Sequence, residues 1–65
     1  MRKVYSVEIE HLDKDGNVWD SQCVLETDSY FDAMSVAEGL SVGENERLAI
    51  WERDDNDCVV DSYEF

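Results

Sequence analysis

The chain has 65 residues and a formal net charge of −12, from 17 acidic and 5 basic side chains. With 43% hydrophobic residues it is too apolar for a disordered segment, and its length allows one domain, residues 1–65, with a small core. The charge excludes nucleic acid and anionic membranes as direct partners, because a strongly negative field repels both.

The N-terminal segment alternates apolar and polar residues instead of running apolar, so it does not have the pattern of a signal peptide. No stretch approaches the length of a membrane span. The two cysteines, Cys23 and Cys58, are too few for a disulfide scaffold. We therefore expect a reduced, cytoplasmic protein.

Two strands are predicted first, because residues 3–12 and 17–26 each alternate with a period of two. The sequence DKDGN between them is a strong hairpin signal. A three-residue loop with Gly16 left-handed pairs Val7 with Cys23 and keeps one face apolar, whereas a two-residue turn would mix carboxylates into that face. The opposite face then carries the polar residues Glu8, Glu10, Asp20, Gln22 and Glu26.

A helix is predicted over residues 27–40, with Ser29 and Asp32 as a capping box and Asp28 as a rival cap. Its sheet-facing residues are spaced at helical intervals: Tyr30, Ala33, Met34, Ala37 and Leu40.

A second hairpin is predicted from two alternating segments, residues 47–54 and 58–65, which flank DDND. A two-residue turn at Asp55-Asn56 pairs Leu48 with Tyr63 and leaves Trp51 on the side of the sheet away from the helix. The face chosen for the helix carries Leu48, Ile50, Val59 and Tyr63, since this choice keeps Arg47 and Arg53 out of the core.

The predicted fold class is α+β: a four-stranded antiparallel sheet in the order ββαββ with one helix packed on one face. The simplest strand order is 2-1-3-4. The order 1-2-4-3 is also antiparallel and stays open.

No catalytic or metal-binding motif is present. DKDGN has its glycine in the wrong place for a calcium loop, and DDND has none. Cys23, Cys58 and His11 lack the short paired spacing of zinc ligands. We expect Cys23 to be a small core residue, His11 to pack beside Trp19, and the protein to use no cofactor or metal and to be no enzyme.

With catalytic and metal-binding motifs absent, the remaining candidate for a functional site is a surface of the protein. Carboxylates two residues apart on a strand lie roughly 6.6–6.8 Å apart, a spacing comparable to that of successive phosphates on a nucleic-acid strand. An exposed tryptophan, or Phe65, would serve as an apolar anchor. The predicted partner-binding residues are Glu8, Glu10, Asp20, Glu26, Trp51, Asp54, Asp55, Asp57 and Glu64.

In size, acidity, element order and absence of catalytic motifs, the chain resembles small acidic inhibitors encoded by bacteriophages: anti-CRISPR proteins, uracil-DNA glycosylase inhibitors and anti-restriction proteins. The resemblance implies a protein partner with a basic nucleic-acid-binding groove, foremost a Cas nuclease. No family motif aligns residue by residue, so the resemblance assigns no binding residue.

Three other interpretations of the charge stay open. The first is a structural or regulatory accessory protein, as a homodimer joined through its open sheet face, whose acidity serves solubility. The second is a halophilic adaptation of the surface, and the third is the binding of cations.

Overall fold

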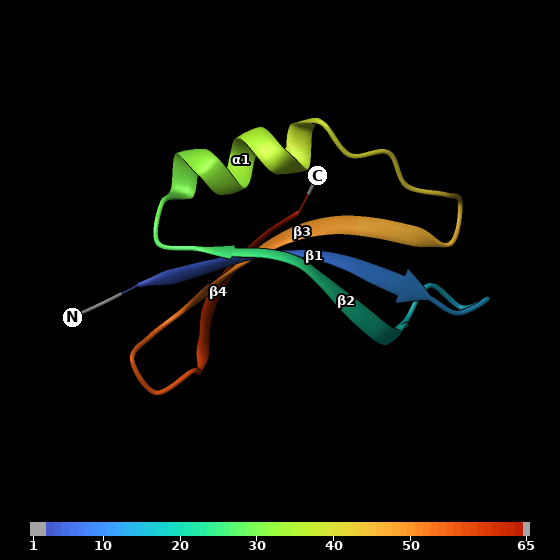
Figure 1. The fold of residues 1–65 in the computed structure, drawn as a ribbon. Coiled ribbons are helices and arrows are strands. Elements are labelled where there is room, and N and C mark those ends of the chain that lie inside the picture. Colours follow the sequence, from blue (N-terminus) through green and yellow to red (C-terminus); the bar gives the residue numbers. More distant parts are fainter. Residues whose placement is uncertain (1–2, 65) are drawn as a thin grey trace.

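The computed structural model describes residues 3–64, so Phe65, one of the two predicted anchors, lies outside the described residues. Along the chain come β1 (Val4–Leu12), β2 (Val18–Thr27), α1 (Tyr30–Glu38), β3 (Glu46–Arg53) and β4 (Val59–Glu64). The sheet order is β2-β1-β3-β4, with every neighbouring pair antiparallel and α1 across one face (Figure 1). The α+β prediction and the preferred strand order are confirmed.

The first hairpin turn has the predicted three-residue loop, Lys14–Gly16, with Gly16 in the left-handed region at φ +83°. Asp13 stabilises the turn with both its backbone and its side chain. Its backbone N–H donates to Asn17 O at 2.8 Å, and its carboxylate Oδ1 accepts from the backbone N–H groups of Asp15 and Asn17. A local Asx-type turn of this kind is the reason aspartate favours such positions.

The second hairpin turn repeats this geometry, so the predicted two-residue turn is wrong. Asp54 N donates to Cys58 O at 3.0 Å, and the loop between them has three residues. Asp57 occupies the position of Gly16, with φ +62°. The prediction failed because no glycine marks this loop, and aspartate tolerates the left-handed region better than most residues.

The register of β1 with β2 starts as predicted at the turn and then shifts twice. Leu12 pairs with Val18, but Val7 pairs with Leu25 and not with Cys23. The two irregularities leave Trp19 and Val24 as extra residues on β2, each of which bends the strand and moves the pairing by one. Between them, every side chain of β2 lies on the face opposite to the predicted one.

This shift changes which polar residues lie together. Cys23 pairs with Glu8, and Ser21 pairs with Glu10, so both lie on the face away from α1. Asp20 pairs with His11 and therefore lies on the other face. The prediction that Asp20 lines the same face as Glu8 and Glu10 is wrong, and Cys23 is an exposed residue instead of a core residue.

The register of β3 with β4 is displaced by two residues from the prediction. Tyr63 pairs with Ile50, not with Leu48. Because two residues are one full period, most side chains keep their predicted faces. Val59 is the exception, since an irregularity near the turn pairs it with Arg53 and leaves it about half exposed.

Helix α1 begins where its cap was predicted: Ser29 Oγ accepts from Asp32 N at 3.3 Å. The backbone N–H of Ser29 donates to Thr27 Oγ1 at 3.1 Å. Ala33 and Ala37 are buried against the sheet, and their small side chains let the helix lie close. The core on this side comprises Val7, Ala33, Ala37, Leu48 and Ile50, flanked by Tyr5, Ile9, Leu25, Met34, Val36, Leu40 and Tyr63.

Candidate functional site

The face of the sheet away from α1, here called the open face, is buried at its centre. Ser6 and Ala49 have no exposed surface, Glu8 is 2% exposed and Glu10 is 7% exposed. Their strands, β1 and β3, are the two central ones, and Glu8 pairs with Ala49. The open face is therefore no ordinary solvated face, and two of its carboxylates need internal compensation.

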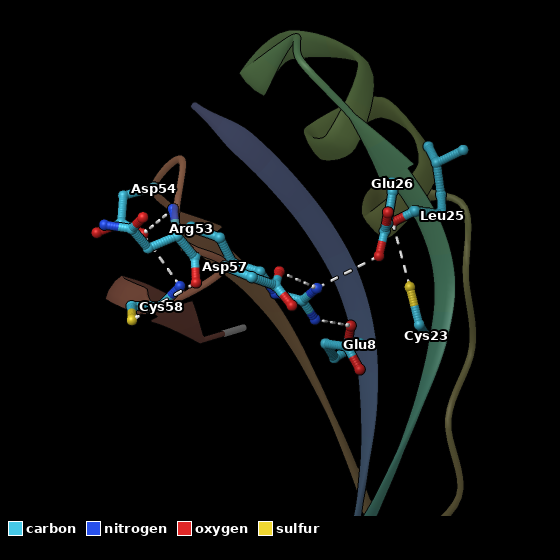
Figure 2. Close-up of polar contacts among 9 residues, drawn as sticks. Glu8, Cys23, Leu25, Glu26, Arg53, Asp54, Asp57 and Cys58 are labelled. Carbon is cyan, nitrogen blue, oxygen red and sulfur yellow. Dashed lines mark hydrogen bonds and ion pairs between the residues drawn. The ribbon is translucent and has the colours of Figure 1, made fainter. Parts of the chain in front are cut away.

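Arg53 provides that compensation for Glu8. Its Nη2 lies 3.6 Å from Glu8 Oε2, while its Nη1 lies 3.3 Å from Glu26 Oε1 and 3.2 Å from Asp57 Oδ1. Figure 2 shows this guanidinium between carboxylates from β1, β2 and the second hairpin turn. The side chain of Arg53 is 18% exposed, so solvent screens its inner contact with Glu8 only weakly.

Arg47, six residues before Arg53 on β3, has the same role for Glu10. Its Nε donates to Glu10 Oε1 at 2.9 Å, and its Nη2 lies 3.3 Å from Glu64 Oε1. The hydrogen bond to Glu10 raises the pKa of the Arg47 guanidinium, so it stays charged. Arginine suits both positions because its planar fork can engage two carboxylates at once.

Two polar atoms at the centre of the open face have no hydrogen-bond partner: Ser6 Oγ and Glu8 Oε2. Cys23 lies opposite Glu8 on β2, and its thiol donates to Leu25 O at 3.7 Å. Burial, followed by hydrogen bonding to Glu8 and the negative charges of Glu8 and Glu26, raises the pKa of this thiol. The thiol is therefore protonated at neutral pH and a poor nucleophile.

Trp51 lies on the open face as predicted, opposite Ser6, but it is half-buried and not an exposed anchor. The guanidinium of Arg53 lies 5.9 Å from the centroid of its indole ring, within the range of a cation–π contact. The ring and the guanidinium cover the buried centre of the sheet together.

The carboxylates of DDND have separate surroundings. Asp54 is half-buried, and its Oδ1 accepts from the backbone N–H groups of Asn56 and Cys58 at 2.9 and 3.0 Å. Asp57 is largely exposed and pairs with Arg53. Asp55 is exposed. Two of the three carboxylates therefore stabilise the turn or its link to β3.

The predicted partner-binding residues thus divide into distinct groups. Arg53 gathers Glu8, Glu26 and Asp57, and Arg47 gathers Glu10 and Glu64. Asp20 is separated from them on the opposite face, where its Oδ1 accepts from Ser21 N at 2.9 Å.

Sequence reasoning missed the outer side of α1. Phe31 is 80% exposed, and the exposed acids Asp28, Asp32 and Glu38 lie along the same segment. The signal was present, because Phe31 falls outside the apolar stripe that ends in Leu40. Trp19, 67% exposed and 6.0 Å from His11 between ring centroids, was placed beside His11 correctly, but its exposure depends on a bulge that no sequence pattern marks.

A second missed carboxylate is Glu52, which is nearly buried on the side of α1. It pairs with Lys3 at 3.6 Å and accepts a hydrogen bond from the Tyr63 hydroxyl at 3.4 Å. Burial, together with Asp61 and Glu52, raises the pKa of Tyr63 to about 12.

Residues 3–64 contain no detected pocket and no group of three or more metal-ligating side chains arranged around a common point. Their single helix is too short and too polar to cross a membrane. Searches of protein-family models, curated proteins and solved structures each returned no match to this chain.

Proposed function

We propose that this protein is a small non-enzymatic inhibitor that occupies a basic nucleic-acid-binding surface of another protein. One observation carries the proposal: the two arginines within residues 3–64, Arg47 and Arg53, are held in ion pairs on the open face. The acids elsewhere on the surface therefore have little positive charge to offset them.

These outer acids are spread over the first hairpin turn, the two edge strands β2 and β4, the helix and the segments that flank it. Within residues 3–64 no ion pair involves the exposed acids Asp15, Asp20, Asp28, Asp32, Glu38, Glu44 and Asp61. Lys14 is exposed and Lys3 is shared with Glu52, so they compensate little of this charge. Such a field raises association rates with basic grooves by about 10- to 1000-fold and falls off over about 8 Å at physiological salt.

The resemblance to bacteriophage-encoded inhibitors supplies the first targets to test, which are bacterial Cas nucleases. DNA cleavage by a panel of purified, guide-loaded Cas nucleases would be measured with and without an equimolar amount of this protein. We expect at least one nuclease to be blocked before it binds DNA and to regain activity as salt rises, because the contact is electrostatic. Polyaspartate at the same total charge is the control.

Inhibition equal to that of polyaspartate would reject a folded binding surface. Absence of inhibition across the panel would reject Cas nucleases as targets, and the same assay would then be applied to uracil-DNA glycosylase and to restriction enzymes.

A homodimeric accessory protein is the second candidate, and strand β4 favours it. β4 is an edge strand, and Val59 and Val60 are each more than half exposed. An exposed edge with apolar residues can pair with the same strand of another copy. Sedimentation that shows a dimer stable in high salt would support this function, and a monomer at all concentrations would exclude it.

A further inference from the structure

The outer side of α1 differs from the open face in having both an exposed aromatic ring and uncompensated charge. On the open face each arginine is already engaged, so the carboxylates there are partly neutralised before any partner binds. On α1, Phe31 is 80% exposed, and the acids around it form no ion pair within residues 3–64. This side therefore offers a surface that needs no rearrangement.

Helical geometry places these residues on one side. Phe31, Ser35 and Glu38 are four and three residues apart, so they lie above one another, about 10 Å from first to last. Asp32 lies next to Phe31, and Asp28 precedes the N-cap Ser29. Ala33 and Ala37 mark the opposite side, which packs on the sheet, and Figure 1 shows nothing covering the outer side.

The exposed ring of Phe31 has an aromatic neighbour in Tyr30. Its centroid lies 6.2 Å from that of Tyr30 in an edge-to-face arrangement. Tyr30 in turn makes edge-to-face contacts with Tyr5 at 5.6 Å and Tyr63 at 5.5 Å. Phe31 therefore extends an aromatic cluster to the surface, and an exposed aromatic side chain can bury a large apolar area when a partner binds.

We propose that the outer side of α1 is the surface that contacts the partner, with Phe31 inserted into an apolar pocket and the flanking acids on a basic rim. This inference rests on the proposed function and names its interface: Asp28, Phe31, Asp32, Ser35 and Glu38. The occupant is a basic protein surface. A second copy of this chain does not fit, because the same acids would face each other across the contact.

The main test compares Phe31→Ala with Trp19→Ala, a matched loss of an exposed aromatic ring on β2. Against a nuclease that the wild-type protein inhibits, Phe31→Ala raises the inhibition constant about tenfold or more, and Trp19→Ala changes it less than about twofold. Both variants keep the far-UV spectrum of the wild type, since both rings are exposed.

The acids are tested with two triple variants that change the net charge equally. Asp28→Asn/Asp32→Asn/Glu38→Gln removes charge on α1, whereas Asp15→Asn/Asp20→Asn/Glu44→Gln removes it elsewhere. The first weakens inhibition more than the second. Equal weakening would mean that only the overall field matters, and would overturn the docking surface.

A second measurement keeps the surface testable if no nuclease is inhibited. The ¹⁵N-labelled protein is titrated with an amphipathic peptide of lysine and leucine, and amide shifts are followed. Shifts centred on residues 28–38 support the surface even where the proposed inhibition fails. Shifts centred on residues 54–64, retained inhibition by Phe31→Ala, or self-association abolished by Phe31→Ala would each overturn it.

Discussion

Replacement of Arg53 by methionine should destabilise the protein severely. Arg53→Met keeps a long apolar side chain over the sheet but leaves Glu8, 2% exposed, without the cation 3.6 Å from its Oε2. Glu8 Oε2 accepts no hydrogen bond, so no other contact compensates the cost of burying the charge on that oxygen. Removing one partner of a buried ion pair costs about 3–5 kcal/mol.

The lower end of that range applies, because the pair lacks a direct hydrogen bond and Arg53 is 18% exposed. A loss of about 3 kcal/mol is large for a 65-residue chain, whose total stability is about 3–10 kcal/mol at 0.05–0.15 kcal/mol per residue. Arg53→Met should therefore retain about 0–7 kcal/mol of stability at 25 °C, so its urea midpoint should fall sharply.

The assay is urea unfolding followed by far-UV circular dichroism. Lys14→Met is the control, because it removes one positive charge from an exposed turn residue and should cost less than about 0.5 kcal/mol. Arg53→Met can lower stability by removing the contact with Glu8 or by making the net charge more negative. Measurements in 0.15 and 1 M NaCl separate these two effects, since salt screens the repulsion across the whole molecule but hardly the buried contact.

The double variant Glu8→Leu/Arg53→Met shows whether the instability of Arg53→Met comes from the uncompensated charge of Glu8 or from lost packing of the arginine side chain. It should regain most of the lost stability, which gives a coupling energy of about 2 kcal/mol or more. If Arg53→Met costs no more than Lys14→Met, or if the double variant is as unstable as the single one, Arg53 does not compensate Glu8 and the reasoning is refuted.

Three further predictions concern the turns, the helix and one tyrosine. Asp54→Ala and Asp13→Ala each remove a carboxylate that accepts from two backbone N–H groups, so urea unfolding should show similar losses of about 1 kcal/mol, against less than about 0.5 kcal/mol for Asp15→Ala. Ala37→Met should cost about 1–3 kcal/mol in the same assay, because Ala37 lies closely on the sheet, and an unchanged midpoint would contradict this packing. In an absorbance titration at 295 nm, Tyr63 should ionise near pH 12, and Tyr63→Phe should remove this ionisation step. Because the pKa of Tyr63 is raised in the folded state, the group contributes stability that is complete below pH 10 and is lost as the pH rises through 12.

The fold could be predicted because its signals are periodic and local. Alternation with a period of two identified the strands, and a serine cap before an apolar stripe located α1. The bulges at Trp19 and Val24 could not be predicted, since an extra residue on one strand leaves the alternation of hydrophobicity nearly unchanged. They decide where Asp20 and Cys23 lie, so the predicted composition of the open face was partly wrong.

The candidate site was less predictable because burial depends on pairs of side chains. The sequence placed Arg47 and Arg53 on the same face as Glu8 and Glu10, but did not indicate that the guanidinium groups would cover the carboxylates. Glu10 lies directly opposite Arg47, whereas Arg53 lies opposite Val4 and reaches Glu8 diagonally across the sheet. Both contacts depend on the register of β1 with β3, which are distant in sequence.

The pairing on the open face also bears on where a partner can bind. Two guanidinium groups there hold five carboxylates, which fixes the positive charge of β3 in one place and leaves the outer side of α1 purely acidic around Phe31. If Arg53 is as important for folding as its contact with Glu8 indicates, the open face cannot release it to a competitor without unfolding. The basic partner proposed above would then bind away from these ion pairs, and α1 is a surface at which an exposed aromatic ring occurs beside acids that form no ion pair within residues 3–64.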